Sequence, residues 1–242
     1  DGVDAPGIVA LRSALASFAD VYTVAPQTEQ SAKSHSITLH HPLRFHEVEE
    51  HVWAVDGTPA DCVYVAFLLK DLLPRRPDMV VSGINHGPNL GNDVHYSGTV
   101  AAAREGALRG VRSIAFSNSS SDMEGAAQYA KRFCRQLLDT TTPPGQAVLL
   151  NVNFPSRPPK GVRATRLGLR LYSDDVEVRD DPRGRHYLWI GGPGGATSEP
   201  VQGADTEALE EGYISVTPLS IEATQPDHLG VAAYVAGRKD AP

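Results

Sequence analysis

Short apolar runs alternate with helical segments along the first part of this 242-residue chain, and no other feature limits the possible folds as strongly. The strand-like runs are residues 21–25, 52–55, 78–81, 112–116 and 147–152. The helical segments are residues 8–18, 58–73, 100 onward and 123–138. Strands that alternate with helices form a parallel sheet with helices on both faces. The sequence therefore predicts an α/β fold.

A change in composition near Pro155 suggests a boundary between a core, residues 1–155, and a second part, residues 156–242. Proline and glycine residues are frequent after the boundary, and the segments between them are strand-like. We expect residues 162–171 and 186–190 to form extended arms. Strands with an uncovered edge tend to pair with another chain, so the arms predict a homodimer or homotetramer.

Two further segments of the second part are simpler to interpret. Tyr213 to Pro218 is an apolar run that we expect to return to the core as a strand, after a short helix over Thr206 to Glu211. The glycine-rich run at residues 191–195 lacks the spacing of a dinucleotide-binding loop. It is predicted to be a flexible turn.

Composition excludes several classes of function. A formal charge of −7 and a pI near 5.7 argue against binding nucleic acid. No apolar run approaches the roughly 20 residues that a membrane helix needs, so no membrane partner is predicted. The only cysteines, Cys62 and Cys134, lie in helical segments and suggest neither a disulfide framework nor a thiolate metal site. Two cysteines without a disulfide framework are typical of a protein in the reducing cytoplasm.

The stretch from Ser82 to Ala103 is the strongest candidate for a functional loop, because it packs amides, hydroxyls and glycines between a strand and a helix. Ligands of α/β sheets bind where strands end in this way. Ser97, Gly98 and Thr99 open the helix, where free N–H groups favour an anion such as phosphate. The alternative is a polar surface turn followed by an ordinary Ser/Thr helix cap.

Two other loops follow or precede strands of the same sheet. Gln27 to Leu39 is rich in hydroxyl groups and is predicted to form a second wall of the site. Thr58, Pro59 and Asp61 match a helix cap with a capping box, and we interpret this motif as mainly structural.

Oxygen-bearing side chains from three loops are expected to meet at one edge of the sheet: Asp1, Ser31 and Asn85. Hard oxygen ligands suit Mg²⁺, Mn²⁺ or Ca²⁺. A bound dication would offset the acidic charge and polarise a phosphoryl oxygen, which points to phosphate ester hydrolysis. Zinc is disfavoured because the histidines at positions 40, 41, 46, 51, 86 and 95 show no fixed ligand spacing.

Eight motifs together resemble the SurE family of stationary-phase survival proteins, which are metal-dependent 5′-nucleotidases. They are DGVDAPGI (1–8), QS-x-x-S-x-SIT (30–38), GTPADCV (57–63), VSGIN-x-GPNLG (81–91), YSGTVAAA-x-EG (96–106), NVN-x-P (151–155), DPRG (181–184) and GYISVTPL (212–219). The resemblance covers nearly the whole chain. It implies a Rossmann-like core, subunits joined through C-terminal arms, and hydrolysis of nucleoside monophosphates. Some members also act on 3′-nucleotides and short polyphosphate.

The resemblance also assigns roles to individual residues. The family's Mg²⁺ or Mn²⁺ is held by two adjacent Asp residues, a Ser and an Asn, and Asp1, Ser31 and Asn85 match three of these. The first Asp has no counterpart, so we expect a strand that carries it to precede Asp1. Asn89 and the Ser97-Gly98-Thr99 turn match positions around the phosphate.

Two functions of different kinds follow from this sequence. The first is a metal-dependent phosphomonoesterase for nucleoside 5′-monophosphates, with Asp1, Asn89, Ser97, Gly98 and Thr99 in the catalytic site. The alternative is a nucleotide-sensing protein that binds its ligand on the same fold without turnover, motivated by the unmatched first Asp.

Overall fold

The computed structural model describes residues 1–141, 147–172, 176–190 and 196–237, so the glycine-rich run at 191–195 lies outside the described residues. The main sheet has five strands in the order β4-β5-β6-β12-β7. Their bounds are β4 Met79–His86, β5 Arg112–Asn118, β6 Leu149–Phe154, β7 Val162–Ala164 and β12 Ile214–Pro218. Strands β4, β5 and β6 are parallel, and β12 is antiparallel to β6.

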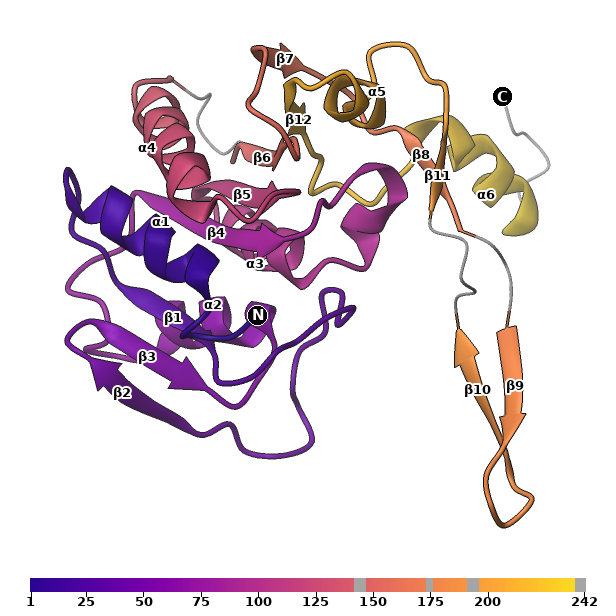
Figure 1. Ribbon diagram of the computed structural model, residues 1–242, viewed down its shortest axis with the longest axis horizontal. Coiled ribbons are helices and arrows are strands. Elements are labelled where there is room, and N and C mark those ends of the chain that lie inside the picture. Colours follow the sequence, from indigo (N-terminus) through magenta and orange to yellow (C-terminus); the bar gives the residue numbers. More distant parts are fainter. Residues whose placement is uncertain (142–146, 173–175, 191–195, 238–242) are drawn as a thin grey trace.

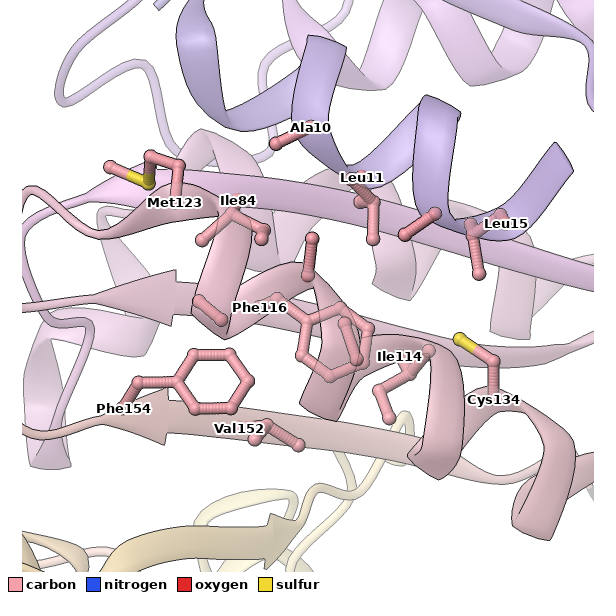
Figure 2. Close-up of a cluster of buried hydrophobic side chains, with 14 of the residues drawn as sticks. Ala10, Leu11, Leu15, Ile84, Ile114, Phe116, Met123, Cys134, Val152 and Phe154 are labelled. Carbon is pink, nitrogen blue, oxygen red and sulfur yellow. The ribbon is translucent and has the colours of Figure 1, made fainter. Parts of the chain in front are cut away.

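Helices cover both faces of this sheet, as the alternation of segments predicts (Figure 1). They are α1 Pro6–Ala16, α3 Gly98–Leu108 and α4 Met123–Leu138. Helices α1 and α4 enclose the larger core, where Leu11, Ile114, Phe116, Val152 and Phe154 meet (Figure 2). Helix α3 covers the opposite face. The amphipathic pattern predicted both ends of α4 correctly, because the buried positions of this helix recur at helical spacing.

A second, three-stranded sheet has the order β1-β3-β2. Its elements, with the helix that packs on it, are β1 Thr23–Pro26, β2 Phe45–Glu49, β3 Val52–Val55 and α2 Pro59–Leu68. An apolar cavity of about 290 Å³ lies between β1 and β4, the edge strands of the two sheets. The predicted parallel sheet is therefore present as two sheets among the described residues.

Most of the other predicted bounds differ from the structure by a few residues, and three predictions need correction. Strand β4 does not end at Val81 but continues to His86, because Asn85 and His86 pair with β5 beyond a register shift. Helix α2 ends at Leu68 rather than near Leu73, since Leu69 has extended backbone angles. Val162–Ala164 is not part of an arm, because it pairs with β12 in the main sheet.

The remaining C-terminal elements form short sheets and helices outside the two main sheets. They are β8 Leu169–Leu171, β9 Val176–Asp180, β10 His186–Ile190, β11 Thr197–Glu199, α5 Asp205–Glu210, η2 Pro226–His228 and α6 Leu229–Val235. Strands β9 and β10 form an antiparallel hairpin that projects from the body of the molecule (Figure 1). Among the described residues, no helix has the length and apolarity needed to cross a membrane.

Gly7 is expected to be essential for the packing of α1 against β4. A β-carbon at Gly7 would overlap the carbonyl oxygen of Ile84, a backbone atom that cannot turn aside. We expect Gly7→Ala to lower the free energy of unfolding by about 1 to 3 kcal/mol, as overpacking of a core does. Urea denaturation measures this. Gly161→Ala is the matched control, because its β-carbon would make only ordinary contacts with Tyr213; equal losses in both variants would contradict the prediction.

Candidate active site

The carboxyl ends of β4, β5 and β6 lie side by side, and polar side chains gather where they end. Asn85 belongs to the end of β4, Ser117 to the end of β5 and Asn153 to the end of β6, and the three strands are hydrogen-bonded in register. Beyond β4 the chain passes through η1 (Gly91–His95) into α3. This edge is where open α/β sheets bind their ligands.

The structure brings together three of the predicted site residues. The Asp1 Oδ2 atom accepts a hydrogen bond from the backbone N–H of His86 at 3.2 Å. The neighbouring Asn85 Oδ1 atom accepts from the hydroxyl of Thr99 at 3.4 Å. Asn85 Nδ2 donates to the carbonyl of Gly87 at 2.8 Å, which turns the side-chain oxygen away from the loop backbone. The first residue, the end of β4 and the start of α3 thus meet at one place.

The loop that carries Ser31 passes close to the start of α3, but the Ser31 side chain makes no hydrogen bond to Asp1 or Asn85. The Ser31 hydroxyl donates to Glu29 Oε1 at 2.6 Å on the exposed surface. The adjacent carbonyl oxygen of Gln30 would lie 3.5 Å from a β-carbon at Gly98. The predicted second wall therefore flanks the site, with the Ser31 hydroxyl bonded within its own loop.

The loop that carries Ser31 is fastened at two places, near its middle and near its end. Ser34 donates from its backbone to the Tyr96 carbonyl at 2.9 Å and from its hydroxyl to the His95 carbonyl at 2.6 Å. At the far end, Asp61 accepts from the backbone N–H and the hydroxyl of Thr38, at 2.9 and 2.7 Å. The capping box of Thr58 and Asp61 is confirmed, and Asp61 additionally holds this loop.

Helix α3 begins with a serine cap, which fits both a predicted anion site and an ordinary helix start. Ser97 is the N-cap, and its hydroxyl oxygen accepts from the backbone N–H of Val100 at 3.1 Å. The N–H groups of Gly98 and Thr99 are in the first turn, so they have no partner within the helix. A β-carbon at Gly98 would come within 2.9 Å of Pro59, which explains why the helix starts on glycine.

Asn89 is surrounded by side chains that the sequence did not single out. Its Nδ2 group donates to Ser117 at 2.7 Å, and its backbone contacts Asn151 and Asn153. A signal was present in the Asn-Val-Asn pattern, since alternate residues of a strand point to the same face. The pattern entered the sequence analysis only as part of the family resemblance.

Asp205 is another residue that sequence inspection missed. Its carboxylate is buried and accepts backbone N–H groups of Gly91 at 3.0 Å, Gly168 at 2.8 Å and Thr206 at 2.9 Å. Burial raises the pKa of this carboxyl group, while the three N–H donors oppose the rise. Asp205 therefore joins the site loop to the start of the C-terminal strands, a role that no local motif reveals.

Thiol and imidazole groups do not form the centre of this site. Burial raises the pKa of Cys134 to about 12, and it raises the pKa of Cys62 as well, so both thiols stay protonated. His86 and His95 are exposed. Within the described ranges no cluster of three His, Cys, Asp or Glu side chains is placed to hold a metal ion. The donors near Asp1 are carboxylate, amide and hydroxyl oxygens, which fit Mg²⁺ or Mn²⁺.

The fold and the candidate site together define an α/β protein with a cluster of polar side chains at the carboxyl ends of its parallel strands. Residues 1–174 match the model of the family described as "Survival protein SurE". The chain belongs to the SurE family.

Individual relatives agree with this assignment over nearly the whole chain. A protein of Sorangium cellulosum named "5'-nucleotidase SurE" is 52% identical, over 98% of this chain and 93% of its own length. A protein of Anaeromyxobacter sp. with the same name is 51% identical, over 93% of this chain and 88% of its own. The crystal structure of the SurE protein from Aquifex aeolicus superposes with a TM-score of 0.83 at 36% identity, covering 98% of this chain and 96% of that one.

Proposed function

We propose that this protein is a divalent-metal-dependent phosphomonoesterase that hydrolyses nucleoside 5′-monophosphates to nucleoside and phosphate. The names of its relatives support a 5′-nucleotidase. The observation that carries the proposal is the meeting of Asp1 and Asn85 with Thr99 at the open end of α3. This arrangement supports the proposal, because carboxylate and amide oxygens that would bind a cation lie close to first-turn N–H groups that would bind an anion.

Asp1, Ser31 and Asn85 would hold the cation. Mg²⁺ or Mn²⁺ bound there would supply the positive charge that stabilises a phosphoryl group during attack by water. The loop between Ser82 and Val100 supplies no lysine or arginine of its own, so a cation would add positive charge that this loop lacks. Ser31 would have to exchange its bond to Glu29 for this role.

The remaining phosphoryl oxygens would be held by groups of the chain itself. The first-turn N–H groups of Gly98 and Thr99 point out of the helix, and the helix dipole favours negative charge there. The Asn89 carboxamide uses one N–H on Ser117 and retains a second donor for the substrate. Fixed donors of this kind stabilise charge that develops in the transition state without having to reorganise.

The test is phosphate release from AMP and GMP in the presence of Mg²⁺ or Mn²⁺. We expect turnover with both nucleotides and none without added metal. The competing nucleotide-sensing function predicts binding of AMP, measured by calorimetry, without phosphate release. Activity on 3′-AMP and on short polyphosphate, which the family resemblance implies, is measured in the same assay.

We also expect the protein to form a dimer or a tetramer through residues of the C-terminal part. The hairpin β9–β10 and helix α6 expose large apolar side chains, among them Val178, Trp189, Ile190 and Val235. Exposed apolar groups of this size mark interaction surfaces. Light scattering should show an even-numbered oligomer, and Trp189→Ser with Ile190→Asp should lower its mass.

Leu68→Asp is the matched control for the oligomer prediction. Leu68 is also exposed, but it belongs to α2 of the core rather than to the C-terminal elements. The control should leave the oligomer intact. A wild-type monomer at micromolar concentration would contradict the prediction and the assignment of these elements as arms.

A further inference from the structure

The backbone N–H and C=O groups of Asn89 are held by two side chains from strand β6. Asn153 Oδ1 accepts from the Asn89 backbone N–H at 2.7 Å, and Asn153 Nδ2 donates to the Asn89 carbonyl at 3.1 Å. Asn151 Nδ2 donates to the same carbonyl at 2.8 Å. Both backbone polar groups of Asn89 are therefore satisfied by strand side chains that lie 62 and 64 residues away in the sequence.

These asparagines occupy positions that would ordinarily be apolar. Asn151 and Asn153 are fully buried and share a face of β6 with Leu149, which packs in the core under α3. A buried amide destabilises a fold unless its polar atoms are paired. The Oδ1 atom of Asn151 has no hydrogen-bond partner among the described residues, which lowers the stability of the fold. The Nδ2 group of the same side chain donates to the Asn89 carbonyl, and this bond is a reason for an amide at this position.

Residues 87–89 need such support because they belong to no helix or strand. The strand β4 ends at His86 and η1 begins only at Gly91, so the loop has few bonds of its own. Ser117, also fully buried, then orients the Asn89 side chain through the 2.7 Å bond to Nδ2. Backbone and side chain of Asn89 are thus fixed separately, by β6 and by β5.

We infer that Asn151 and Asn153 are positioning residues for phosphoryl transfer: they clamp the backbone of Asn89 so that its carboxamide meets the phosphoryl group. This inference rests on the proposed function, in which Asn89 contacts the substrate. The clamp acts on geometry, and in the described part of the chain neither asparagine side chain is hydrogen-bonded to Asp1, Ser31 or Asn85. Removing it therefore lowers the rate of the chemical step and spares metal binding.

The first experiment compares Asn153→Ala with Ser215→Ala in AMP hydrolysis. Displacing a group that contacts the substrate lowers the rate by about tenfold to a hundredfold, and we expect this loss in kcat with little change in KM. Ser215 is the residue of the adjacent strand β12 that pairs with Asn153. Its buried hydroxyl has no hydrogen-bond partner among the described residues, so it is not bonded to Asn89. Ser215→Ala should keep the wild-type kcat. An unchanged kcat in Asn153→Ala would overturn the inference.

A double-mutant cycle with Asn89→Ala separates positioning from a general structural role. In the Asn89→Ala variant the carboxamide is absent, so the position of the backbone at residue 89 no longer affects the phosphoryl group. Asn153→Ala should therefore add little to the loss in kcat caused by Asn89→Ala. If the loss in kcat of the double variant equals the product of the two single losses, Asn153 acts independently of the Asn89 carboxamide, and the inference is overturned.

Stability is monitored by thermal unfolding, because Asn153→Ala leaves the Asn89 N–H without its acceptor. Should that variant not fold, Asn151→Ala provides the test, since Asn153 still holds both backbone groups of Asn89. We expect a smaller loss of kcat there, and full wild-type activity would overturn the role of Asn151. No phosphate release by wild-type protein would instead overturn the proposed function, so the two failures are distinguishable.

Discussion

Asp1→Asn is expected to abolish phosphate release from AMP and to weaken binding of Mg²⁺ or Mn²⁺ sharply. The substitution keeps the shape of the side chain and removes the only charged group among the three predicted ligands. Loss of the cation removes several kcal/mol of transition-state stabilisation, which corresponds to a rate decrease of about a thousandfold or more. Folding should change little, because Asp1 contributes a single exposed hydrogen bond to His86.

The comparison should be made in proteins that carry the same short peptide before Asp1, so that no terminal ammonium group lies beside the carboxylate. Asp4→Asn is the matched control: Asp4 is exposed in the same loop and is not a predicted ligand. Its activity should match the wild type. Removal of the metal by a chelator should stop phosphate release by the wild-type protein, and added Mn²⁺ or Mg²⁺ should restore it. Normal phosphate release by chelated protein would refute the metal assignment.

Asn89→Ala should lower kcat by about a hundredfold or more, the usual effect of removing one donor to a developing negative charge. Metal affinity should remain close to that of the wild type, because Asn89 is hydrogen-bonded to Ser117, Asn151 and Asn153 rather than to a predicted ligand. Steady-state kinetics and a metal titration measure both quantities. Equal losses in turnover and metal affinity would place Asn89 among the metal ligands instead.

Thr99→Ala should also lower turnover, but it is a less selective test than Asn89→Ala. The Thr99 hydroxyl donates to Asn85 Oδ1, the atom predicted to bind the cation. We therefore expect some loss of metal affinity in addition to the loss of rate. Thr99→Ser retains the hydroxyl and should preserve both properties, which distinguishes the hydrogen bond from the methyl group of the side chain.

The predicted sheet illustrates where sequence patterns stop being informative. Apolar periodicity identified the strands, but it could not indicate that β1 and β4 are separated by a cavity or that β4 continues through polar residues to His86. Strand pairing depends on the partner's backbone: Asn85 and His86 belong to β4 because β5 lies beside them. The polar side chains of Asn85 and His86 alone predict a loop.

Sequence alone determined the features that depend on near neighbours. The caps at Thr58 and Ser97 bond N–H groups three residues away. The family motifs predicted one site that includes Asp1, Asn85 and Thr99. Only the tertiary structure revealed the supports of that site. Asn153 contacts Asn89 across 64 residues, and Asp205 contacts Gly91 across 114. Such contacts follow from the order of strands and the packing of α5, so no local spacing encodes them.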